Sequence, residues 1–162
     1  MRRHRALGAI AGLAAAGAAA CISFDIRRYP EPENAVAAFV LCRIVDAEGD
    51  VLKPGAETAE FNADDARVLA FAGVRNVARA IRLRWKWYGP DRSLARDTGD
   101  VEVNAEGKSL ELVTAYDALD LEADKAVLGA WTALLFIDGR LAARRAFSVS
   151  GAEDNSPRGS GT

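Results

Sequence analysis

Apolar and charged side chains alternate along the chain between residues 79 and 88. The apolar positions are Ile81, Leu83, Trp85 and Trp87, and the charged positions between them are Arg82, Arg84 and Lys86. A period of two is typical of a strand with one buried face. Helical spacing is also present, because Val74, Ala78, Ile81 and Trp85 share one face of a helix. We favour the strand, since Gly73 and Asn76 interrupt a longer helix and aromatic and β-branched residues prefer sheets. Residues 74–86 are therefore either strand or helix, with the strand preferred.

The other segments between residues 35 and 150 are short apolar or alternating runs separated by turn residues. The runs that predict strands include residues 38–46, 98–104, 109–116, 130–137 and 140–150. Asp138-Gly139 lies between the last two runs, and this dipeptide accepts the positive φ angles of a two-residue hairpin turn. We therefore predict an all-β fold, an antiparallel sandwich of about seven or eight strands.

The N-terminal segment has a different pattern. Arg2, Arg3 and Arg5 precede residues 6–20, which contain only Ala, Gly, Leu and Ile. A basic start, an uncharged run and small residues at its end are the layout of a secretory signal peptide. The run falls short of the roughly 20 apolar residues needed to span a bilayer. We predict a signal peptide over residues 1–20.

A cysteine follows this segment directly. The motif Ala18-Ala19-Ala20-Cys21 resembles the lipobox of bacterial lipoproteins, although the family's usual Leu three places before the Cys is absent. The resemblance implies that Cys21 is acylated and becomes the first residue of a membrane-anchored protein. Ile22 in place of Asp resembles lipoproteins directed to the outer membrane. Ordinary secretion with cleavage nearby and an uncleaved Ala-rich anchor are the alternatives.

Composition shifts divide the mature chain into three parts. Residues 21–34 contain Pro30 and Pro32, which favour an extended tether. Residues 35–150 form the predicted sandwich. Residues 151–162 contain no apolar side chain larger than Ala, which predicts a disordered tail.

Several motifs within residues 35–150 resemble the immunoglobulin-like and fibronectin type III-like domains of bacterial surface lipoproteins. They are Trp85-Lys86-Trp87-Tyr88-Gly89-Pro90-Asp91, Gly129-Ala130-Trp131, Asp138-Gly139 and Ala146-Phe147-Ser148-Val149. The resemblance implies an aromatic strand that runs into a turn, and a Gly-x-Trp strand that pairs with the last strand. It implies no activity, because such folds host many functions.

The residue inventory excludes several kinds of chemistry. His4, the single histidine, lies in the segment to be removed, so the mature chain lacks the ligands of a His/Cys metal cluster and the base of a catalytic triad. With Cys21 acylated, Cys42 is a lone thiol in an apolar run and is best explained as a small buried side chain. We predict no enzyme activity, no cofactor and no metal. A hydrolase based on carboxylates such as Asp64 and Asp65 is the least supported alternative.

The charges are separated along the chain. Residues 67–96 contain eight basic and one acidic residue, whereas residues 97–124 contain nine acidic and one basic. Asp117, Asp120, Glu122 and Asp124 offer oxygens for Ca²⁺, but a solvated acidic loop explains them better, because the EF-hand pattern is absent. The mature chain keeps 18 basic and 23 acidic residues, which argues against binding to nucleic acid.

The basic residues of the alternating segment suggest a binding face. Arg82, Arg84 and Lys86, together with Arg140 and Arg144, are the predicted binding residues. The competing explanation is a solvated strand face whose charges pair with acidic residues of a neighbouring strand. Aromatic rings could stack on sugars, but we assign Trp85, Trp87 and Trp131 to the core and keep Tyr88 and Tyr116 as candidates for exposed contacts.

The sequence thus predicts a non-catalytic lipoprotein of the bacterial cell envelope whose sandwich domain binds another envelope protein. The membrane contact is the lipid on Cys21, and an outer-membrane location is expected in a Gram-negative cell. The alternative is an accessory module that binds an anionic glycan or lipid headgroups through the basic strand face.

Overall fold

The computed structural model describes residues 32–48, 51–122 and 127–151, which form eleven strands and no helix. The strands are β1 (Ala35–Cys42), β2 (Val45–Glu48), β3 (Val51–Pro54), β4 (Glu60–Asn62), β5 (Arg67–Val77), β6 (Ile81–Tyr88), β7 (Leu94–Asp97), β8 (Val101–Val103), β9 (Leu110–Asp120), β10 (Gly129–Ile137) and β11 (Arg140–Ser150). No helix in these ranges is long and apolar enough to cross a membrane. The predicted signal peptide, tether residues 21–31, Cys21, Asp124 and residues 152–162 lie outside the described residues.

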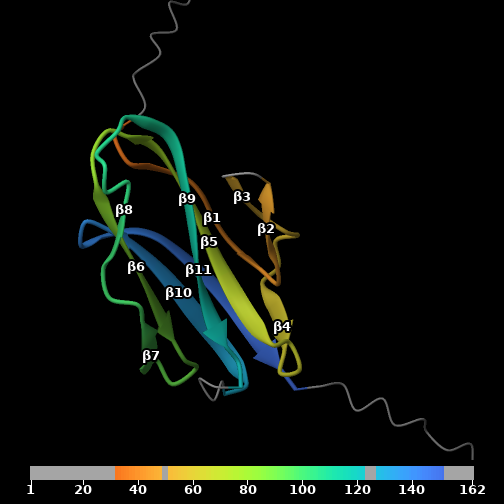
Figure 1. The fold of residues 1–162 in the computed structure, drawn as a ribbon. Helices are drawn as coiled ribbons and strands as arrows, with labels where there is room; N and C mark the ends of the chain where they lie inside the picture. The colour runs from red at the N-terminus through yellow and green to blue at the C-terminus, as the bar shows by residue number, and fades with distance from the viewer. Residues whose placement is uncertain (1–31, 49–50, 123–126, 152–162) are drawn as a thin grey trace, which may run out of the picture. The chain divides into compact units, whose positions relative to one another are not determined.

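The strands form two main sheets (Figure 1). One has three strands in the order β1-β5-β9, and the other has the order β4-β11-β10-β6-β7 with β8 also pairing with β6. All pairs are antiparallel except β4 with β11. Immunoglobulin-like sandwiches place strands A, B and E in one sheet and C, F and G in the other. Strands β1, β5 and β9 match the first set and β6, β10 and β11 the second, which confirms the predicted fold class.

One apolar core lies between the two sheets. It receives Phe39 and Leu41 from β1, alternate residues of β5, and Trp85 and Trp87 from β6. Trp131 from β10 belongs to the same core. The three tryptophans are at most 3% exposed, so their assignment to the core is confirmed.

The ambiguous segment is a pair of strands. β5 ends at Val77 and β6 begins at Ile81, and residues 81–88 alternate between buried and partly or fully exposed positions. Asn76 has a φ of 55°, in the left-handed region that a helix interior does not use. The preference for strand over helix is therefore confirmed.

The predicted hairpin is also confirmed. Asp138 and Gly139 have φ angles of 49° and 77°, the two positive values of a type I′ turn. Ile137 and Arg140 on either side of this turn pair directly as the last residues of β10 and the first of β11.

The run at residues 38–46 was wrongly predicted as one strand. β1 ends at Cys42, and a separate hairpin of β2 and β3 follows. The amide of Leu52 in β3 donates to Oγ1 of Thr114 at 3.4 Å, and Thr114 points to the outer side of the three-stranded sheet. The hairpin therefore lies over the outer face of that sheet, where Leu69 and Phe71 are buried although they point away from the core.

Cys42 lies under the same hairpin. It is fully buried, and its Sγ is 4.0 Å from the carbonyl oxygen of Leu69. Burial raises the pKa of the thiol, so the neutral form is favoured. These contacts confirm that Cys42 is a small buried side chain.

The sequence predicts a solvated loop for the acidic residues after position 116, and this prediction is wrong for the first of them. Asp117 and Asp120 belong to β9, and Asp117 points between the sheets, because it pairs with the inward-facing Ala70. Its carboxylate accepts a 2.7 Å hydrogen bond from Nε1 of Trp87 and forms an ion pair with Arg96 of β7. Asp117 thus connects the two sheets instead of facing solvent.

Candidate interaction surface

Alternation along β6 places the predicted basic residues on the outer side of the six-stranded sheet. Arg82 is exposed, and Arg84 and Lys86 are partly exposed, whereas the residues between them are buried. The strand geometry therefore gives these three side chains one common face, as the sequence pattern indicates.

Arg84 and Lys86 on this face have an acidic neighbour. Nε and NH2 of Arg84 donate to the two carboxylate oxygens of Asp97 at 2.7 and 2.5 Å, a bidentate contact. Nζ of Lys86 lies 3.7 Å from the same carboxylate. The hydrogen bonds from Arg84 lower the pKa of Asp97 to about 2. Asp97 thus offsets one of the two positive charges at this part of the strand, and Asp100 lies 3.9 Å from NH1 of Arg84.

Arg82 lies beside β8, where its register partner is Glu102. Its backbone amide donates to Oδ1 of Asp138 at 3.0 Å, and its side chain lines a shallow pocket with Glu102 and Asp138. Two carboxylates therefore lie near this basic residue, but its guanidinium forms no ion pair with a described residue.

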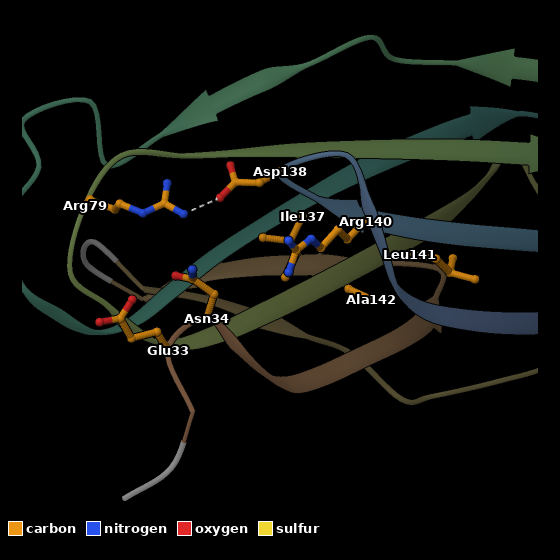
Figure 2. A pocket seen from close by; sticks show the side chains of 8 residues that line it. All are labelled: Glu33, Asn34, Arg79, Ile137, Asp138, Arg140, Leu141 and Ala142. Atoms are coloured by element: carbon orange, nitrogen blue, oxygen red, sulfur yellow. Dashed lines mark hydrogen bonds and ion pairs between the residues drawn. The ribbon is translucent and has the colours of Figure 1, made fainter.

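Arg140 lies at the end of the sandwich, next to the β10–β11 turn. It lines a pocket with Glu33, Asn34, Arg79 and Asp138 (Figure 2). NH2 of Arg79 donates to Asp138 at 2.8 Å across this pocket. The pKa of Asp138 is lowered, mainly by the hydrogen bond from the Arg82 amide and also by the contact with Arg79. Arg140 itself forms no ion pair with a described residue.

Arg144 lies closer to β6 than its sequence position indicates. In the register of β6, β10 and β11, Lys86, Leu134 and Arg144 stand side by side. Arg144 is exposed and forms no ion pair with a described residue. The structure therefore brings Lys86 and Arg144 into one row and leaves Arg82 and Arg140 near the other end of the sheet.

Apolar residues fill the outer face between these cations, and they are not among the binding residues predicted from the sequence. Leu134 and Phe136 of β10 point outward and are partly exposed, and Leu141 of β11 is 58% exposed. Nζ of Lys86 lies 5.4 Å from the centre of the Phe136 ring, within cation–π range. We call Leu134, Phe136, Leu141 and Arg144 the outer patch. The available signal was the sequence of β10, in which Thr132 is the only polar side chain and the polar alternation of a solvated face is missing.

A cleft lies next to the outer patch. It has a volume of about 750 Å³, and its lining includes Tyr88 at the end of β6, Pro90 in the following turn, and Leu134, Leu141 and Arg144. Tyr88 is partly exposed here, whereas Tyr116, 47% exposed, lies on the other sheet. The two tyrosines proposed for exposed contacts are thus on opposite sheets, and only Tyr88 adjoins the outer patch.

No group of three or more His, Cys, Asp or Glu side chains in the described ranges is placed to hold a metal ion. The polar side chains that line the cleft beside the outer patch are two arginines, Tyr88, Thr132 and the indole of Trp131, and none is a carboxylate. Such a set is suited to binding by apolar contact and charge.

Comparison with known proteins gives likeness at the level of structure. No family model matches the chain, and no curated protein matches it. An alkylpurine DNA glycosylase, AlkC, from Pseudomonas fluorescens, solved bound to DNA containing an abasic site analogue, aligns with a TM-score of 0.46 and 10% identity; the match covers 73% of this chain and 30% of AlkC. An immunoglobulin-like protein from Pseudomonas aeruginosa aligns with a TM-score of 0.41 and 18% identity, over 75% of this chain and 99% of that one.

Proposed function

We propose that this chain is a lipid-anchored lipoprotein of the bacterial cell envelope whose immunoglobulin-like domain binds another envelope protein through the outer patch. The observation that carries the proposal is the apolar outer face of the six-stranded sheet at Leu134, Phe136 and Leu141. An antiparallel sheet that faces water normally carries polar residues there. Contiguous exposed apolar patches are typical of protein interaction sites.

The composition of the outer patch favours a protein partner. Protein interfaces combine an apolar centre with arginine and aromatic residues, and Phe136, Arg144 and the neighbouring Tyr88 supply these types. A purely electrostatic ligand has less to bind, because Asp97 already pairs with Arg84 and Lys86.

The second candidate, an anionic glycan or lipid headgroup, is favoured by one observation. Arg140 and Arg144 form no ion pair with any described residue. Both side chains are therefore available to an anion. They lie four residues apart on β11, with Arg140 at the turn.

Membrane attachment is proposed from the sequence. Thirteen residues separate Cys21 from Ala35, the first residue of β1. A chain of that length reaches at most about 45 Å. Acylation of Cys21 would therefore keep the domain close to one membrane, where its partner would also be found.

Photocrosslinking in the native bacterium tests the protein partner. A photoreactive residue at Leu141 is expected to crosslink to one defined envelope protein, and Leu134→Glu in the same chain is expected to reduce that product at least tenfold. The matched control places the photoreactive residue at Leu112, which is 45% exposed on the outer side of the other sheet. Equal crosslinking from both positions, or none from Leu141, would contradict the proposal.

Two further measurements test the lipid anchor and the alternative glycan function. Mass spectrometry of membrane-extracted protein is expected to show a diacyl or triacyl adduct on Cys21, and an intact Met1 terminus would contradict the anchor. Retention of purified anionic polysaccharide that is lost in Arg140→Glu and Arg144→Glu, together with no crosslink from Leu141, would favour the glycan function instead.

A further inference from the structure

Strand β11 has an open edge over most of its length. One side pairs with β10 from Arg140 to Val149, whereas the other side pairs with β4 only at Ser148, Val149 and Ser150. No strand of the described residues pairs with this second edge between Arg140 and Phe147. We call this eight-residue stretch the open edge. An unpaired edge offers backbone donors and acceptors to another strand.

The contacts at the end of β11 show which backbone groups point to the open edge. The amide of Ser148 donates to Ala59 at 2.9 Å, and the carbonyl of Ser150 accepts from Ala63 at 2.8 Å, so even-numbered residues face the β4 side here. Because backbone groups alternate in direction along a strand, Ala146 and Arg144 also direct their N–H and C=O groups to the open edge. Their β10-facing neighbours, Arg145 and Phe147, do not.

A groove runs along this edge. It has a volume of about 490 Å³ and lies between β1 and β11. Ala37 and Ala38 line it on the β1 side, and Ala142 and Ala143 line it on the β11 side. Such small side chains let a backbone approach closely. An added strand would place one row of its side chains against Val36 and Phe39, at the margin of the core.

The charge along the groove selects the kind of strand. Arg144 and Arg145 line it, and Arg140 lies just beyond it in the same strand. Arg145 has one acidic neighbour, Glu57, at 3.8 Å, and no described carboxylate forms an ion pair with Arg140 or Arg144. A segment with acidic residues on its outer side is electrostatically complementary to this edge.

We propose that the open edge of β11 binds an extended, acidic segment of the partner protein by β-strand addition. The segment adds a strand to the six-stranded sheet, with apolar residues directed toward the groove and acidic residues beside Arg144. Backbone hydrogen bonds supply affinity and the alternate side chains supply specificity. This inference rests on the proposed function: because Arg144 belongs to both surfaces, the added strand continues the outer patch.

Hydrogen exchange of the membrane-extracted chain in detergent tests the proposal. The probe is a synthetic octapeptide of alternating Val and Glu, and the control is the same peptide with Lys in place of Glu. In the free chain, the amides of Arg144 and Ala146 are expected to exchange rapidly, as open-edge amides do. The Val-Glu peptide is expected to slow both at least tenfold, without slowing the amide of Leu52 in the β2–β3 hairpin or that of Thr114 in the three-stranded sheet.

Three variants sharpen this test. Ala146→Pro removes an open-edge donor and leaves the β10 pairing in place, so it is expected to abolish the protection of Arg144. Arg144→Glu is expected to reverse the preference in favour of the Val-Lys peptide, and Arg144→Lys to retain the original preference. A Val-Glu peptide with N-methylated backbone amides is expected to give no protection; this arm requires no protein variant and so does not depend on folding of the mutants.

Other results would overturn the proposal. Slow exchange of Arg144 and Ala146 in the free chain means that the edge is already occupied, by residues outside the described ranges or, if protection rises with protein concentration, by a second copy. Equal protection by both peptides, or no protection by either, would contradict the proposal that the open edge binds an acidic strand. Crosslinking from Leu141 is measured separately, so the outer patch can bind a partner even if the edge does not.

Discussion

The two main sheets differ in what lies over their outer faces. The outer side of the β1-β5-β9 sheet carries Leu69 and Phe71, which are at most 5% exposed, and the β2–β3 hairpin lies over this face. The outer side of the β6-β10-β11 region carries Leu134, Phe136 and Leu141, and no described element lies over them. Both sheets thus have apolar outer positions, but within the described ranges a chain segment lies over only one of them.

This difference explains how two similar apolar patterns acquire different roles. Burial of an aromatic side chain contributes about 1.5–3 kcal/mol to folding, so Phe71 stabilises the domain. Phe136 is only partly buried, and its remaining apolar surface is available to a partner. The ion pairs differ in position too, since Asp117 of β9 is held between the two sheets and Asp97 of β7 lies on the outer side of the six-stranded sheet.

The largest expected effect comes from Phe71. Phe71→Ala leaves a cavity under the hairpin and is expected to lower the free energy of unfolding by about 3–5 kcal/mol. The matched variant Phe136→Ala is expected to cost about 1 kcal/mol or less, because the ring is partly in water already. Urea denaturation of both variants measures the difference, and equal losses would contradict the distinction between a covered and an open face.

Asp117 gives the next largest effect. Asp117→Ala removes the acceptor of the Trp87 indole and the partner of Arg96, and is expected to lower the free energy of unfolding by about 2 kcal/mol. Asp117→Asn keeps an oxygen acceptor and is expected to cost about half as much. If the two variants are equally stable in urea denaturation, the Trp87 bond contributes nothing and the tie between the sheets is weaker than its geometry implies.

Much of the fold followed from the sequence because its signals are local. Alternation at residues 81–88 and the Asp138-Gly139 turn each depend on a few neighbouring residues, and both predictions were correct. The β2–β3 hairpin was missed, because four-residue strands carry little periodicity and their position depends on distant contacts such as that between Leu52 and Thr114. Asp117 was misjudged for the same reason, since its partners Trp87 and Arg96 are 30 and 21 residues away.

The candidate surface was only partly predictable. The alternating pattern indicated that Arg82, Arg84 and Lys86 share a face. It could not show that Arg84 and Lys86 pair with Asp97 or that Arg144 lies in line with Lys86, because both depend on the register between strands. The apolar run of residues 130–137 was consistent with a strand buried on both faces. Only the arrangement of sheets shows that one of its faces is open.

A smaller effect concerns acid stability on the six-stranded sheet. The pKa of Asp97 is about 2 in the folded chain, below the usual value of about 3.9. A depressed pKa adds stability that is present above about pH 4 and is lost as the pH falls toward 2. Solvent limits this contribution to about 1 kcal/mol or less. Asp97→Asn is therefore expected to flatten the loss of stability between pH 4 and 2, measured by urea denaturation, and an unchanged pH profile would show that the Arg84 contact contributes no linkage.

The smallest expected effect measures how tightly the hairpin closes the other sheet. Cys42 lies under this cover, and in a chain carrying Cys21→Ser it is the single thiol, because the sequence has only two cysteines. Thr114→Val removes the acceptor of the Leu52 amide, and a long, partly exposed bond of this kind is worth about 0.5 kcal/mol. If local opening of the hairpin exposes the thiol, labelling of Cys42 by a thiol reagent is expected to quicken about two- to threefold, with global stability nearly unchanged. A rate that changes only in proportion to global unfolding would instead mean that the hairpin and the sheet beneath it open as one unit, and that the cover is an integral part of the fold.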